Sequence, residues 1–148
     1  MRQILGSVVF LALAVPLIAD EKEDALKKLN GTYEVLSLVI EGKADTKKAD
    51  KVTFVIKDGT LTVIEADKKD RNENAKITLD PSKKPAQIDL TPDKGKDETL
   101  LGIYEVKETD KGTELTIALG RDKTARPKDF KGEGKGEMVV KVLRKKEK

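Results

Sequence analysis

The chain has 148 residues, of which 39 % are charged and 37 % apolar, with a formal net charge of +3 and neither histidine nor cysteine. This length fits one domain with a single core. The composition excludes disulfide bonds, Ser-His-Asp and Cys-His nucleophiles, and zinc sites of the usual kind. Disorder of the whole chain is the alternative for so charged a sequence, but charges of mixed sign and alternating apolar residues favour a folded sheet.

Residues 1–19 have the layout of a secretory signal peptide. Arg2 precedes an uncharged apolar stretch that runs to Ile18 and ends abruptly at the acidic sequence DEKED. Cleavage is expected after Ala19, so that residues 20–148 form a secreted or periplasmic domain without a membrane span. The apolar stretch is shorter than the roughly 20 residues of a comfortable span, and an uncleaved anchor is the alternative.

One short helix and eight strands are predicted after the leader. Asp20–Asn30 is expected to be helical, because Asp20 and Glu23 have capping-box spacing and Leu26 and Leu29 share a face. From Gly31 onward apolar and polar residues alternate, as in strands with one buried face. The expected strands are Thr32–Ile40, Val52–Lys57, Thr60–Glu65, Ala75–Leu79, Ala86–Leu90, Leu100–Lys107, Glu114–Ala118 and Glu137–Lys145.

Most connections between these strands are short and rich in turn residues. Asp58-Gly59 is a strong hairpin signal, since both central positions of a type I′ turn need positive φ. Short connections join antiparallel neighbours and leave no room for crossover helices. Eight such strands enclose their apolar faces most simply as an up-and-down barrel, which also removes the sheet edges. The fold class is therefore predicted as an all-β, eight-stranded antiparallel barrel with a short N-terminal helix.

Alternation also predicts which side chains face the barrel interior. The first strand is apolar on both faces; we expect Tyr33, Val35 and Val39 inward, with Leu36 and Leu38 outward beneath the helix. Arg144 shares the inward parity of the last strand. The other side chains expected inward are Val52, Phe54, Ile56, Leu61, Val63, Ile77, Leu79, Ile88, Leu90, Leu115, Ile117, Met138, Val140 and Val142.

Three segments carry a resemblance that covers nearly the whole mature chain. They are LNGTYEVLSLVIEGK, then LDPSKKPAQIDLTP followed by LLGIYEV, and ARPKDF with VVKVL. Together they resemble a small secreted domain family expanded in planctomycete bacteria and described as lipocalin-like. The resemblance implies an eight-stranded barrel and no established activity. Gly31-Thr32-Tyr33 also resembles the G-x-W signature of lipocalins, with Tyr33 in place of tryptophan. That likeness implies that Arg144 lies across the Tyr33 ring at the closed end of the barrel, as a structural contact.

No catalytic constellation is recognisable in the remaining residues. Acidic side chains fall mostly on outward positions or in turns, and KGEGKGE lacks the spacing of a phosphate-binding loop. Asp67 and Asp70 lack EF-hand spacing, which favours a solvated loop over a calcium site. The lysines are interleaved with acidic residues and lack a stacking set of aromatics, which disfavours nucleic acid as a partner. We expect a protein that is not an enzyme and uses no cofactor or metal.

Two functions remain open. The first is a binding barrel for a small apolar or amphiphilic molecule, with Tyr33, Phe54 and Tyr104 as the large rings of its lining. A tyrosine hydroxyl would be its polar handle, and binding would depend weakly on salt. The second is a structural or interaction domain of the cell envelope, with a solid core and an exported protein as partner. A void of a few hundred Å³ would favour the first function.

The connection from Gly120 to Gly136 is longer than the hairpin turns and is the other candidate site. Long connections in compact domains are often functional. Arg126, Pro127 and Phe130 could form a lid over the barrel mouth. The alternative, which we favour, is that Phe130 plugs that end while the lysines and glycines stay in solvent.

Overall fold

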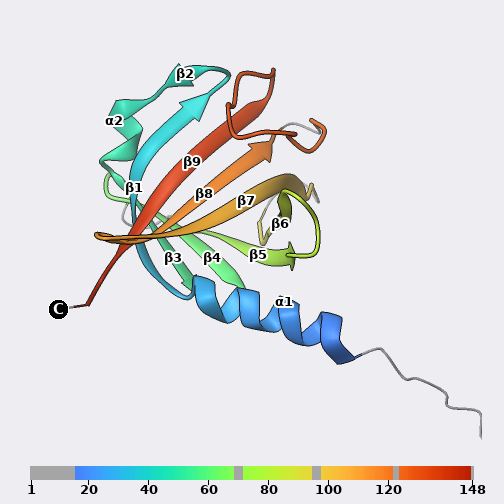
Figure 1. Cartoon of the computed structure of the whole chain (residues 1–148). Helices are drawn as coiled ribbons and strands as arrows, with labels where there is room; N and C mark the ends of the chain where they lie inside the picture. Colours follow the sequence, from blue (N-terminus) through green and yellow to red (C-terminus); the bar gives the residue numbers. More distant parts are fainter. Residues whose placement is uncertain (1–15, 69–71, 95–97, 122–123, 148) are drawn as a thin grey trace, which may run out of the picture.

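A computed structural model describes residues 16–68, 72–94, 98–121 and 124–147 (Figure 1). Strands dominate, and two helices accompany them in this part of the chain. The elements are α1 (Pro16–Leu29), β1 (Gly31–Ile40), β2 (Lys43–Ala44), α2 (Thr46–Ala49), β3 (Val52–Lys57), β4 (Thr60–Glu65), β5 (Glu73–Asp80), β6 (Ala86–Pro92), β7 (Leu100–Thr109), β8 (Gly112–Gly120) and β9 (Glu137–Lys145).

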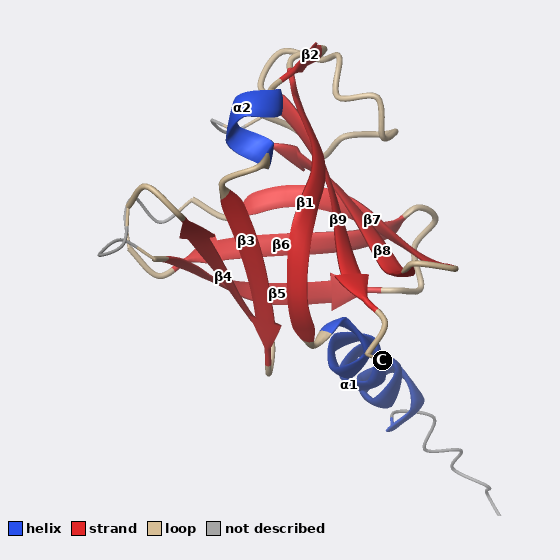
Figure 2. Ribbon diagram, turned by 90° about the vertical axis from the view of Figure 1, so that its left-hand side faces the viewer, coloured by secondary structure: helices blue, strands red, loops and turns tan. Residues whose placement is uncertain are grey.

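The strands form one antiparallel sheet that closes on itself (Figure 2). Among the described residues, β1 and β3 to β9 follow one another, and β9 pairs with β1 to complete the ring. The predicted eight-stranded antiparallel barrel is therefore confirmed. Asp58 and Gly59 both have positive φ, at 48° and 78°, so the predicted hairpin turn between β3 and β4 is also confirmed.

The last turns of helix α1 pack against one end of the barrel through Ala25, Leu26 and Leu29, and we call this the closed end (Figure 1). The helix begins at Pro16, four residues before the predicted start, so Asp20 is not the helix cap. Proline fits the first turn of a helix because no intrahelical partner is lost there. The predicted cleavage point after Ala19 thus lies inside α1. No helix among the described residues is both long and apolar enough to cross a membrane.

The core is a single apolar cluster inside the barrel, and the predicted inward parity is confirmed for β3 to β6, β8 and β9. Four side chains at its centre are 0 % exposed: Tyr33, Ile88, Leu115 and Val142. The buried members are Leu29, Tyr33, Phe54, Ile56, Leu61, Ile77, Leu79, Ile88, Leu90, Tyr104, Leu115, Ile117, Leu119, Val140 and Val142.

The predicted parity of β1 is wrong beyond its midpoint. The register against β9 shifts between Val35 and Ser37, which marks a β-bulge at Leu36. One extra residue moves each later side chain of the strand to the opposite face of the sheet. Leu38 therefore lines the interior, whereas Val39 packs on the outer face and Leu36 is 45 % exposed rather than covered by the helix.

Beyond the bulge, β1 and β3 are no longer paired with each other. β3 pairs with β1 only over Gly31 to Glu34, whereas the far end of β1 pairs with the two-residue strand β2. Helix α2 lies between β2 and β3 at this end of the barrel (Figure 2). Asp45 caps this single turn by accepting a hydrogen bond from the backbone N–H of Lys48 at 3.1 Å. Neither β2 nor α2 was predicted, because four residues are too few to show a helical period.

Candidate ligand cavity

A cavity of about 670 Å³ occupies the half of the barrel away from α1. Its wall is mostly aliphatic, with Phe54 as the one large ring among the described lining residues. An eight-stranded barrel is just wide enough for side chains to fill, and valine, leucine and alanine here leave part of that space empty. The apolar lining comprises Val35, Leu38, Ile40, Ala49, Val52, Phe54, Leu61, Val63, Ala75, Leu90, Leu100, Ile117, Leu119, Met138 and Val140.

The other half of the barrel is packed, and both tyrosines belong to it. Tyr33 is fully buried and donates a hydrogen bond from its hydroxyl to the Leu29 carbonyl at 2.8 Å. Tyr104 is 7 % exposed and borders α1 rather than the cavity. Of the three rings predicted to line a ligand site, the structure therefore places only Phe54 on the cavity wall. A tyrosine hydroxyl is not the polar group at this cavity.

Burial raises the pKa of both tyrosines above the ordinary value. Loss of hydration is the main cause for Tyr33; the Arg144 cation opposes it and Glu108 adds to it. For Tyr104 the main cause is again burial, with a smaller contribution from Asp80. Both phenols are thus neutral at ordinary pH. Tyr33 contributes packing and a hydrogen bond to the closed end, Tyr104 contributes packing, and neither contributes charge.

Arg144 lies across the Tyr33 ring, as predicted from its parity and the lipocalin likeness. Its guanidinium carbon is 5.6 Å from the ring centre. The same group donates to the Lys28 and Asn30 carbonyls, and to the Thr113 hydroxyl at 3.1 Å. It therefore ties the end of α1 and the start of β1 to β8 and β9.

Gly31 makes room for this crossing. It has φ of +144°, and a Cβ there would collide with the Arg144 side chain.

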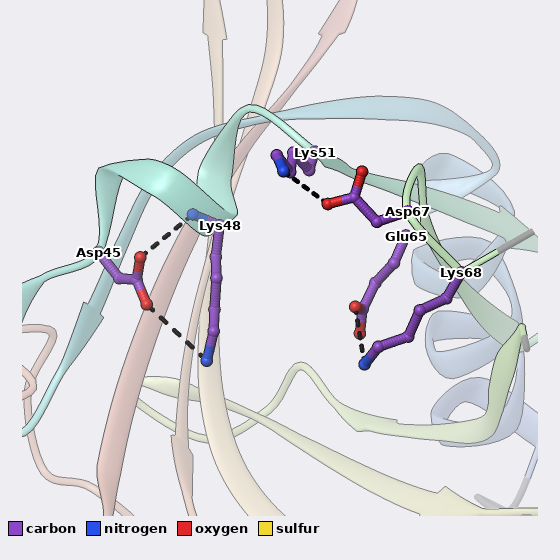
Figure 3. Close-up of polar contacts among 6 residues, drawn as sticks. All are labelled: Asp45, Lys48, Lys51, Glu65, Asp67 and Lys68. Carbon is purple, nitrogen blue, oxygen red and sulfur yellow. Dashed lines mark hydrogen bonds and ion pairs between the residues drawn. The ribbon is translucent and has the colours of Figure 1, made fainter.

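Charged side chains surround the open end of the cavity. Lys47 and Lys48 belong to α2, and Lys51 lies two residues after the end of that helix. Glu65 is the last residue of β4, and Lys68 follows it three residues later. Figure 3 shows the resulting ion pairs. Their N–O distances are 3.8 Å for Lys48 with Asp45, 2.5 Å for Lys51 with Asp67, and 3.0 Å for Lys68 with Glu65. Because these side chains are largely exposed, the pairs contribute little stability and leave the rim adaptable.

Arg121 is the cation that reaches the cavity from the barrel wall. It directly follows β8 and continues the inward row of Leu115, Ile117 and Leu119 by two residues. Its Nε is buried, and among the described residues no hydrogen-bond acceptor partners it. Arg121 was not among the residues predicted from the sequence to line the interior. Extending the period-two row past Leu119 would have found it.

The residues predicted as a lid lie on the outer face of the barrel. Arg126 donates to the Asp89 carboxylate at 2.7 Å and to the Gly102 carbonyl at 2.6 Å. Phe130 packs against an outer cluster of Ile103, Ala118 and Val139, with Val39 beside it. Pro127 is buried, and none of the three predicted residues lines the interior cavity. Phe130 does not plug the cavity either; these contacts fasten the connection to the wall.

A second hollow, of about 970 Å³, lies outside the barrel between α1 and β7. It is larger than the interior cavity, but its sides include Glu21, Asp24, Lys28, Glu105 and Glu108. Charged groups also edge the interior cavity, but more apolar side chains line its wall, so a ligand there would remove more apolar surface from water. The interior cavity is therefore the better candidate for a ligand site.

Metal-binding arrangements do not come together in the described part of the chain: no group of three or more acidic side chains lies close enough to hold an ion. Asp67, considered above for calcium, is paired with Lys51, and Asp70 lies outside the described residues.

The chain matches no protein-family model, no curated protein and no solved structure. The resemblance to the lipocalin-like planctomycete family therefore stays a prediction.

Proposed function

We propose that this chain is an exported, non-enzymatic binding barrel that holds one small apolar or amphiphilic molecule. The observation that supports this function most directly is the cavity of about 670 Å³ with an aliphatic wall. Small-molecule sites are typically concave, mostly apolar cavities of about 300–1,000 Å³ with a few polar groups at one side. A purely structural barrel needs no such space, because larger side chains at these positions would add packing.

A neutral apolar dye, N-phenyl-1-naphthylamine, is expected to bind inside the barrel with enhanced fluorescence. Leu119→Trp should weaken this binding by about tenfold or more, because the indole would occupy the cavity that Leu119 lines. Fluorescence titration of the folded variants measures the effect, and circular dichroism establishes that each variant is folded.

Val106→Trp is the matched control, since Val106 lines the outer groove and is 44 % exposed. It should leave dye binding within about twofold of the parent. Loss of binding in Val106→Trp alone would move the site to the outer groove. A parent protein that binds no dye would favour the structural or protein-interaction alternative.

Export is the second part of the proposal and rests on the layout of residues 1–19. The protein recovered from outside the cytoplasm of its host should begin at or within a few residues of Asp20. Edman sequencing of that protein gives the answer directly. Recovery of an intact Met1 in a membrane fraction would show that the segment is an anchor.

A further inference from the structure

We propose that Arg121 binds the anionic head group of a single-chain amphiphile whose tail fills the cavity. This inference rests on the proposed binding function and names its ligand class. Arg121 is the one cation among the described lining residues that both sits on the barrel wall and has a buried, unpartnered nitrogen.

The buried nitrogen of Arg121 needs an acceptor. Arginine stays charged in proteins, and a buried donor of a charged group without a partner is costly, so native proteins nearly always satisfy it. Nε and a neighbouring Nη of a guanidinium form a planar fork that matches the two oxygens of a carboxylate or phosphate. No described side chain offers those oxygens to Nε. A ligand anion would complete the site.

The charges around the mouth favour an anion over a cation. Of the acidic groups that line the cavity, Glu65 and Asp67 are already paired with Lys68 and Lys51, and Glu73 is exposed at the start of β5. The remaining lining groups include Lys47 and Arg121, which have no ion pair with any described residue. The local field at the mouth is therefore positive, although the chain carries a net charge of only +3.

The shape of the cavity selects a single tail. From Arg121 the inward row leads to Leu119 and then Ile117, and Phe54 lines the same cavity. A head group at Arg121 would leave the chain attached to it in contact with this apolar wall. The packed cluster around Tyr33 and Tyr104 then ends the cavity. One extended or bent alkyl chain matches such a space, and burying it supplies the main free energy of binding.

The test compares two ligands with the same chain, dodecanoate and methyl dodecanoate, by displacement of N-phenyl-1-naphthylamine. Arg121→Gln should weaken dodecanoate about tenfold or more, because it removes the charged fork, and should change the methyl ester by less than about twofold. Dodecyl phosphate, as a third ligand, distinguishes the head groups: the one that loses more affinity in Arg121→Gln is the preferred anion. Lys107→Gln, an exposed site on β7, is the control with the same loss of charge.

Two further measurements test the role of Arg121. Arg121→Lys keeps the charge without the planar fork and should give an intermediate affinity for dodecanoate. The melting temperature of ligand-free Arg121→Gln should stay equal to or rise above that of the parent, whereas a structural arginine would lower it. Equal displacement by both ligands, unchanged in Arg121→Gln, would overturn the head-group inference and leave the binding barrel standing. Failure of both ligands and of the dye to bind would overturn the barrel function itself.

Discussion

Replacing Tyr33 with alanine is expected to lower the free energy of unfolding by about 3–5 kcal/mol, as for other large buried aromatics. Tyr33 is fully buried at the closed end, and its ring packs within the main cluster under Arg144. Alanine would leave a cavity at the closed end of the barrel, beneath α1, and would remove the hydrogen bond from the Tyr33 hydroxyl to the Leu29 carbonyl. Urea unfolding followed by far-ultraviolet circular dichroism measures the loss.

Tyr33→Phe is the matched control because it keeps the ring and removes only the hydroxyl. Its cost should be about 0.5–1.5 kcal/mol, the usual contribution of one hydrogen bond. A similar cost for alanine and phenylalanine would show that the ring itself adds nothing. That result would contradict the packed closed end.

Arg144→Met is the substitution with the next largest expected effect, a loss of about 2–4 kcal/mol from hydrogen bonds to a charged group and from the ring contact. Methionine keeps much of the side-chain length, so the change removes mainly the donors to the Lys28, Asn30 and Thr113 oxygens. Because Arg144 is only partly buried, the lower end of the range is the firmer expectation.

A double-mutant cycle separates the ring contact from the hydrogen bonds of Arg144. Tyr33→Leu combined with Arg144→Met should cost less than the sum of the two single changes, by about 0.5–2 kcal/mol. Lys141→Met, a charge removal elsewhere on β9, should show no coupling to Tyr33→Leu. Additive costs for the Tyr33 and Arg144 pair would mean that the cation does not stabilise the ring.

The barrel could be predicted from the sequence because period-two alternation and short turns leave few ways to enclose the apolar faces. The same pattern failed in β1, where apolar residues on both faces gave no alternation to fix the register. A bulge at Leu36 then reversed the second half of the strand. Such a bulge depends on pairing with a distant strand, here β9, and local sequence does not encode it.

The candidate site could be predicted only in part. Phe54 was correctly expected inward, but the division of the interior into a packed and a hollow half depends on side-chain volumes summed across eight strands. Tyr33 and Tyr104 fell in the packed half for this reason. The placement of Arg126 and Phe130 depends on which part of the barrel the Gly120–Gly136 connection packs against. Arg126 pairs there with Asp89, which is 37 residues away in the chain.

The split between β1 and β3 also bears on how fast a bound molecule could exchange. At the open end these two strands are not joined by backbone hydrogen bonds; β2 and the single turn of α2 stand between them. Because Ala49 of α2 is buried and lines the cavity, entry here would require this single turn to move, although no pairing between β1 and β3 would have to break. Association is slower when binding requires a conformational change, so the movement of α2 would set the rate at which a ligand exchanges. For the proposed binding function, ligand exchange would thus depend on one short helix and not on opening the strand pairs of the barrel.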